Sequence, residues 1–102
     1  MNQVQKKHFL LKLIPPRVTF QQDMTDQERA IMKQHTEYWL ELMNKRFVVL
    51  FGPVMDPNNP HGIGILEVTD EKEIQFFIEN DPAVKSGIGK TEVYPMKAII
   101  RP

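Results

Sequence analysis

The sequence predicts a single α+β domain, residues 1–102, whose elements follow the order β-α-β-β-α-β. Three observations predict it: helical periodicity in two stretches, apolar strand-like segments beside each, and turn residues between the two middle strands. The predicted strands are residues 8–14, 47–51, 63–68 and 90–100, and the predicted helices are residues 25–46 and 70–80. This order is the split βαβ pattern of ferredoxin-like folds, in which both helices cover one face of a four-stranded antiparallel sheet.

The first predicted strand ends at Pro15 and Pro16, because proline has no N–H group to continue a ladder of hydrogen bonds. The loop at 17–24 is longer than most connections between elements, which hints at a binding role. Arg17 lies in this loop and could clamp an anionic substrate, although a solvated loop arginine is the commoner case.

The longest helix is predicted to begin at Thr25. Thr25 and Glu28 have the spacing of a capping box, in which each side chain bonds the backbone amide of the other residue. On a helical wheel, His35 lies inside the apolar stripe, whereas Leu40 faces the polar side. Trp39 extends the stripe, and an aromatic residue there belongs to a core more often than to a ligand site.

The later segments carry more local signals. Residues 47–51 form a continuous apolar run rich in β-formers, which predicts a buried central strand. Gly64 inside the third strand predicts a bulge or a close backbone approach, and Pro95 predicts an edge or a bulge in the fourth. A second capping box is predicted from Asp70 to Glu73.

His35 has two interpretations. Histidines of intermediate burial are commonly core residues bonded to a neighbour. The alternative is a general acid/base, which a carboxylate partner would orient. Asp81, directly before Pro82, has the pattern of a helix N-cap followed by proline at the first helical position, and capping alone accounts for it. As a site residue, Asp81 would be the partner of His35.

Composition excludes several classes of function. The chain has 13 basic and 13 acidic residues, whereas nucleic acids and anionic membranes select a basic excess. Without cysteine there is no thiolate chemistry, and the histidines have no spacing typical of a metal site. No apolar run is long enough to span a membrane, and no secretory signal is recognisable. We expect a cytoplasmic protein that needs no metal and no cofactor.

One face of the predicted sheet has no helix to cover it. If that face is apolar, a second copy packed sheet to sheet would bury it. The topology therefore predicts a homodimer.

Six short motifs, in this order, resemble those of the YCII family. They are D-M-T with the acidic turn after it at 23–28, H-x-x-Y-W at 35–39, F-G-P-V at 51–54, G-x-G at 62–64, D-P-A-V at 81–84 and Y-P-M-K at 94–97. Each motif is weak alone, but the ordered set is fairly specific and spans about residues 8–100. The resemblance implies a ferredoxin-like fold that dimerises into an α+β barrel.

The resemblance also implies a pocket built on a His-Asp pair, which maps onto His35 and Asp81. Gly52 and Pro53 match the family's turn beside the pocket. We therefore expect His35 and Asp81 to be catalytic, and Arg17, Trp39, Gly52 and Pro53 to bind substrate.

The expected function is that of a cofactor-independent lyase, isomerase or dehydrochlorinase-like enzyme acting on a small anionic or phenolic molecule. His35 would shuttle a proton, and Asp81 would hold its tautomer. The alternative is a non-catalytic ligand-binding or assembly module on the same scaffold. A haem-linked oxygenase of related fold is the remaining option.

Overall fold

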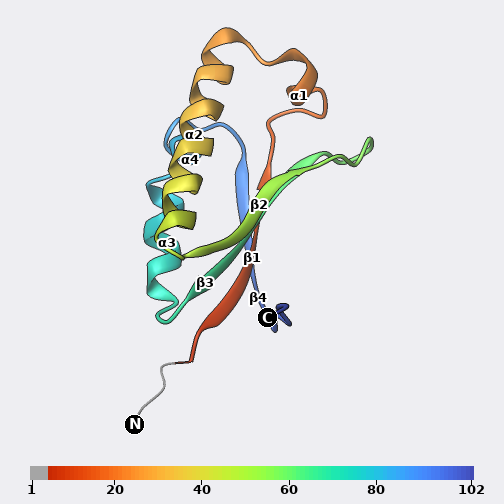
Figure 1. Cartoon of the computed structure of the whole chain (residues 1–102). Coiled ribbons are helices and arrows are strands. Elements are labelled where there is room, and N and C mark those ends of the chain that lie inside the picture. The colour runs from red at the N-terminus through yellow and green to blue at the C-terminus, as the bar shows by residue number, and fades with distance from the viewer. Residues whose placement is uncertain (1–4) are drawn as a thin grey trace.

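Four antiparallel strands form one sheet in the order β2-β3-β1-β4 (Figure 1). They are β1 (Lys7–Ile14), β2 (Val48–Val54), β3 (His61–Val68) and β4 (Lys90–Met96). The structure, a computed structural model, describes residues 5–102, and the first four residues of the predicted domain lie outside that range. Strand β4 ends at Met96, four residues before the predicted end at residue 100.

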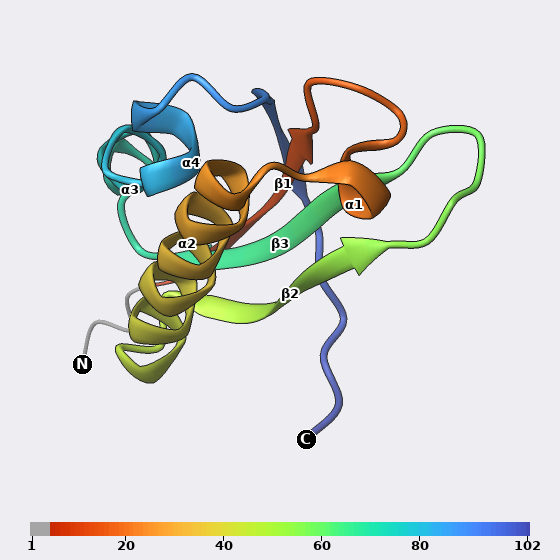
Figure 2. The ribbon, with the colours of Figure 1, turned by 90° about the horizontal axis from the view of Figure 1, so that it is seen from above.

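Helices α2 (Asp26–Asn44), α3 (Lys72–Glu79) and α4 (Pro82–Lys85) cover one face of this sheet, whereas α1 (Phe20–Asp23) lies near the end of the sheet where β1 ends (Figures 1 and 2). Helix α2 packs on β2 and α4, and α3 packs on β3. The predicted ferredoxin-like α+β fold is confirmed. Among residues 5–102, no helix is both long and apolar enough to cross a membrane.

The core lies between the helices and the covered sheet face. Side chains alternate between the two faces of a strand, so Phe9 and Leu11 of β1 are buried beneath the helices while Leu10 points to the opposite face. The core cluster consists of Phe9, Leu11, Trp39, Leu42, Val48, Leu66, Val68, Ile74, Phe77 and Ile78. It joins α2 and α3 to three strands.

The two predicted capping boxes have different outcomes. At Thr25 both bonds are present: Glu28 N donates to Thr25 Oγ1 at 3.1 Å, and Thr25 N donates to Glu28 Oε1 at 2.9 Å. The box at Asp70 is wrong, because α3 begins two residues later and the Asp70 carboxylate accepts from Lys72 N at 2.9 Å instead. An aspartate readily forms this local turn, which competes with the longer capping contact.

The prediction of a buried central strand at 47–51 is wrong. Strand β2 is an edge strand, and it continues through Gly52 and Pro53 to Val54. Val48 is buried, whereas Leu50 is 48% exposed. A continuous apolar run indicates a strand but does not reveal whether one neighbouring strand or two will pair with it.

Two local predictions in the sheet are confirmed. Strand β4, which contains Pro95, is the other edge of the sheet. Gly64 allows a close approach: a Cβ atom there would lie 2.8 Å from Cζ3 of Trp39. The ring of Trp39 therefore rests directly on the backbone of β3.

Candidate active site

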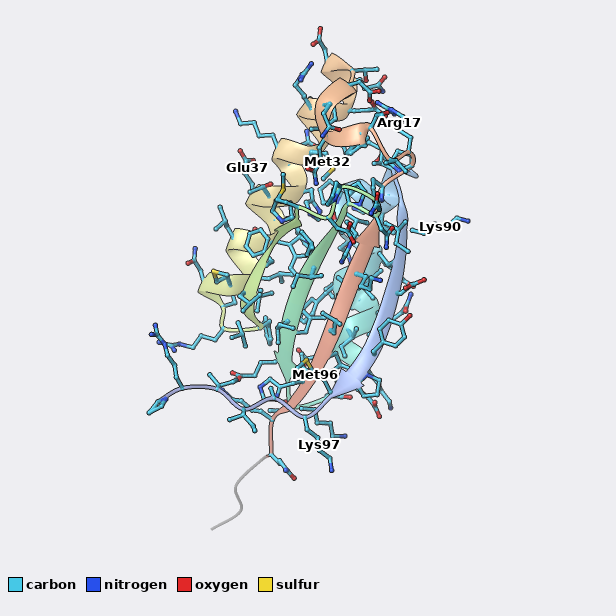
Figure 3. The ribbon with its side chains drawn as sticks, turned by 90° about the vertical axis from the view of Figure 1, so that its right-hand side faces the viewer. Arg17, Met32, Glu37, Lys90, Met96 and Lys97 are labelled. Atoms are coloured by element: carbon cyan, nitrogen blue, oxygen red, sulfur yellow. The ribbon has the colours of Figure 1, made fainter. Side chains whose placement is uncertain are left out.

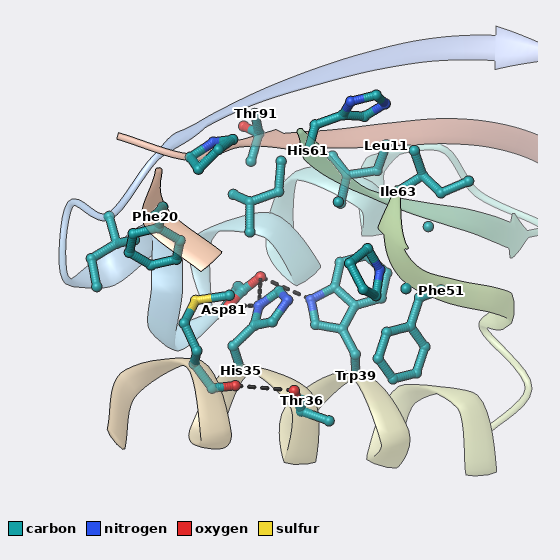
Figure 4. A pocket seen from close by; sticks show the side chains of 18 of the residues that line it. Leu11, Phe20, His35, Thr36, Trp39, Phe51, His61, Ile63, Asp81 and Thr91 are labelled. Atoms are coloured by element: carbon teal, nitrogen blue, oxygen red, sulfur yellow. Dashed lines mark hydrogen bonds and ion pairs between the residues drawn. The ribbon is translucent and has the colours of Figure 1, made fainter. Parts of the chain in front are cut away.

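His35 and Asp81 meet between α2 and the start of α4. The Nδ1 atom of His35 lies 2.8 Å from Oδ1 and 2.9 Å from Oδ2 of Asp81, across 46 positions of sequence. Helix α2 projects His35 toward the sheet, and the turn after α3 places Asp81 opposite it (Figure 4). The fold thus brings together the two residues that were predicted to pair.

Asp81 is also the N-cap of α4, so one carboxylate both caps this helix and bonds His35. Its Oδ1 accepts from Ala83 N at 2.9 Å, and its Oδ2 accepts from Trp39 Nε1 at 2.8 Å. The residue is 2% exposed. Together with His35, three N–H groups point at this buried carboxylate, an arrangement that suits its ionised form.

The hydrogen bond to Asp81 determines the tautomer of His35. An ionised carboxylate can only accept, so Nδ1 of His35 carries the proton in this bond. When the ring is neutral, Nε2 then has a free lone pair. The His35 side chain is 15% exposed and lines a cavity, so Nε2 belongs to a ring that a bound molecule can reach.

The cavity has a volume of about 400 Å³, within the usual range for small-molecule sites. Its walls are mainly apolar, and its polar side chains are few. The residues that line it are Leu11, Leu13, Pro15, Phe20, Gln21, Met24, Met32, His35, Thr36, Trp39, Phe51, Gly52, Pro53, His61, Gly62, Ile63, Gly64, Asp81, Ile88 and Thr91. None of these is a lysine or an arginine.

Three of the predicted substrate-binding residues line this cavity: Trp39, Gly52 and Pro53. Trp39 is 2% exposed, and its ring centroid lies 6.1 Å from that of His35. The Nε1–H of Trp39 holds Asp81 while its ring forms part of the wall. Trp39 therefore connects the buried carboxylate to the wall of the cavity.

Arg17 lies elsewhere. Its guanidinium bonds both oxygens of Glu28, with Nη2 at 2.8 Å from Oε1 and Nη1 at 2.9 Å from Oε2. Its Nε donates to Asp23 Oδ1 at 2.7 Å, and Nη2 donates to Asp23 O at 3.0 Å. Arg17 is not among the residues that line the cavity. The Arg17 guanidinium thus donates its hydrogen bonds to acceptors within the protein.

The residues that connect β1 to α2 line the cavity in place of Arg17. Pro15, Phe20, Gln21 and Met24 contribute to the wall, and Phe20 is 4% exposed. The residue pattern did not identify these positions individually. The unusual length of the loop was the available signal, and the structure places a short helix, α1, within it.

Within the described part of the chain, no three or more His, Cys, Asp or Glu side chains form a group that could hold a metal ion. Asp81, the acidic residue of the cavity, has its oxygens occupied by N–H donors.

Comparisons with known proteins give a family and a fold. The YCII-related domain family matches residues 13–97. A 5-chloro-2-hydroxyhydroquinone dehydrochlorinase from Burkholderia phenoliruptrix, solved in complex with 2,5-dihydroxybenzoquinone, has a TM-score of 0.67 at 23% identity, covering 88% of this chain and 93% of that one. An uncharacterized protein from Thermotoga maritima has a TM-score of 0.56 at 14% identity, covering 91% and 100%. Among curated proteins there is no significant match.

Proposed function

We propose that this chain, which belongs to the family of YCII-related domains, is a cofactor-independent enzyme that acts on a small hydroxylated ring. In this proposal, His35 is the general acid/base and Asp81 is the partner that orients it. The observation that carries the proposal is the hydrogen bond from His35 Nδ1 to Asp81 at 2.8 Å, beside an apolar cavity. It leaves Nε2 as the atom that exchanges a proton with a bound molecule.

The proposed step is an elimination. On a chlorinated, hydroxylated aromatic ring, a proton first moves from one ring hydroxyl to the carbon that bears the chlorine, which makes that carbon tetrahedral. Nε2 of His35 then accepts the proton of a second ring hydroxyl, the O–H electron pair forms a C=O double bond, the adjacent ring double bond shifts to the carbon that bears the chlorine, and chloride departs with its bonding electrons. The imidazolium formed is stabilised by the Asp81 carboxylate, to which Nδ1–H still donates. Returning the proton to a different atom of the ring, without loss of a group, would make the reaction an isomerisation.

The chemistry of the cavity walls supports a phenolic ligand over an anionic one. No lysine or arginine lines the cavity. Trp39 and Phe51, whose ring centroids are 6.0 Å apart, offer aromatic surface. The side chains of Gln21 and Thr91 line the same space and form no hydrogen bond with the described part of the chain. They are available to hydroxyl groups of a ligand.

We also propose that two copies pack through the sheet face opposite the helices (Figure 3). The strand register places Leu50, Ile65, Leu10 and Tyr94 in one row across all four strands. Leu10 and Ile65 are half-buried, and Leu50 and Tyr94 are each 48% exposed. A continuous apolar row of this kind is typical of a surface that another molecule covers.

The proposed function can be tested with two probes drawn from the structural neighbour. Binding of 2,5-dihydroxybenzoquinone is followed by the fluorescence of Trp39, the single tryptophan, and turnover of 5-chloro-2-hydroxyhydroquinone is followed by chloride release. We expect His35→Gln to lower turnover by about 10²–10⁴-fold while changing the affinity for the quinone by less than about tenfold. Asp81→Asn should lower turnover as well, because an amide cannot accept all three N–H groups.

The matched control is His8→Gln. His8 is also bonded to a carboxylate, with Nε2 2.9 Å from Glu67 Oε2, but it does not line the cavity. Turnover by the His8→Gln variant should equal that of the wild type. Binding without turnover in the wild-type protein would favour the non-catalytic ligand-binding module, and absence of both would contradict the proposal.

A further inference from the structure

The four N–H···O bonds of Arg17 tie the segment that lines one side of the cavity to the helix that carries His35. Asp23, the last residue of α1, accepts from Arg17 through both its carboxylate and its backbone oxygen. Glu28, in the first turn of α2, accepts through both carboxylate oxygens. Figure 3 shows Arg17 beside α1, at the end of the molecule where α2 begins.

Each partner of Arg17 is itself fixed by a further bond. Asp23 Oδ2 accepts from Thr19 Oγ1 at 2.7 Å, a bond that spans α1 from its N-cap to its last residue. Glu28 Oε1 accepts from Thr25 N at 2.9 Å, which is half of the capping box of α2. The carbon Cζ of Arg17 lies 5.3 Å from the centroid of the Phe20 ring. One guanidinium thus contacts the first and last residues of α1 and the first turn of α2.

This segment contributes Phe20, Gln21 and Met24 to the cavity, while the next two turns of α2 contribute Met32 and His35. The bonds of Arg17 therefore link the wall formed by this segment to the wall formed by α2. We propose that Arg17 is a positioning residue that holds α1 against the start of α2 and so keeps the wall formed by Phe20, Gln21 and Met24 at a set distance from His35. The charge of Arg17 suggested direct contact with substrate. In this proposal Arg17 acts indirectly, through the position of the cavity wall.

The bonds of Arg17 form a network of ion pairs, in contrast to an ordinary isolated pair on a protein surface. Isolated exposed pairs contribute little to stability, whereas bidentate arginine–carboxylate pairs and networks are the exceptions. Arg17 forms such a bidentate pair and a second ion pair at once. Hydrogen bonds from Arg17 and the Thr25 amide lower the pKa of Glu28 to about 2, so the pair stays charged at neutral pH. Since the Arg17 side chain is 36% exposed, high ionic strength should weaken the network.

The test compares Arg17→Gln with Lys45→Gln, which removes a pair between Lys45 and Glu41 at the far end of the same helix. The first readout needs no ligand: amide hydrogen exchange of residues 15–24 and quenching of Trp39 by acrylamide. Both should rise in Arg17→Gln and stay at wild-type levels in Lys45→Gln. High salt should reproduce part of the effect in the wild type, and Arg17→Lys should recover only part of the protection, because a lysine cannot form the bidentate pair.

The second readout is the affinity for 2,5-dihydroxybenzoquinone, and here the inference rests on the proposed function. We expect Arg17→Gln to weaken binding by about tenfold, because the displaced wall must be ordered again on binding. If the quinone does not bind the wild type, the exchange and quenching data still decide the role of Arg17. Unchanged exchange and quenching in Arg17→Gln would overturn the inference. Should that variant fail to fold, Asp23→Asn, which removes one of the two acidic partners, gives the same comparison.

Discussion

At the scale of single residues, Asp81 combines a local and a long-range role. Its cap on α4 follows from two adjacent positions, Asp81 and Pro82, and was predictable from them. Its bonds to His35 and Trp39 span 46 and 42 positions, and no local pattern encodes them. The pairing was anticipated only through the resemblance to a family, because residue spacing alone favoured capping.

Gly64 offers a prediction at the same scale. Gly64→Ala should destabilise the fold by about 1–3 kcal/mol, since overpacking forces neighbouring groups to move. The added Cβ would lie 2.8 Å from the Trp39 ring, whereas a Cβ at Gly52 would meet nothing within 4 Å. Gly52→Ala, the matched control, should change stability by less than about 0.5 kcal/mol. Denaturant unfolding measures both changes, and equal stabilities for the two variants would contradict this account of the contact.

At the scale of elements, the N-cap of α2 at Thr25 was predicted to the residue, while the far end of α2 and the bounds of the strands were less exact. Capping residues act through bonds three positions apart, so Thr25 and Glu28 carried enough information. The same reasoning failed at Asp70, where a shorter turn competes. The edge position of β2 depends on which strands pair, and this is a long-range property.

The network at the start of α2 predicts how stability changes with pH. The pKa of Glu28 is lowered from 4.5 to about 2 in the folded state. Its contribution is therefore fully present above about pH 4.5 and is lost as the pH falls toward about 2. The wild type should be more stable than Glu28→Gln at pH 7, and the difference should shrink over this window.

Urea unfolding at several pH values measures this difference. Glu37→Gln is the control, since Glu37 is exposed on α2 and forms no ion pair within residues 5–102. Its difference from the wild type should be small at every pH. A gap between wild type and Glu28→Gln that stays constant from pH 7 to pH 2 would refute the linkage.

At the scale of the whole molecule, the uncovered sheet face predicts association. Leu50→Glu places a charge in the apolar row and should convert a dimer into a monomer, because burying an unpaired charge is costly. Leu40→Glu is the matched control: Leu40 is 46% exposed and Leu50 is 48% exposed, but Leu40 lies on α2. Sedimentation equilibrium distinguishes the two states. A monomeric wild type, or a Leu50→Glu protein that dimerises as the wild type does, would rule out this interface.

The sequence by itself determined the order of the elements, the start of α2, the cap at Asp81 and the close approach at Gly64. These features depend on hydrogen bonds and steric limits among neighbouring residues or on regular periodicity. Tertiary structure decided that β2 is an edge, that Arg17 binds Asp23 and Glu28, and that the loop before α2 lines the cavity. It also decided that His35 and Asp81 meet, because contacts between distant positions form only when the chain packs into one arrangement.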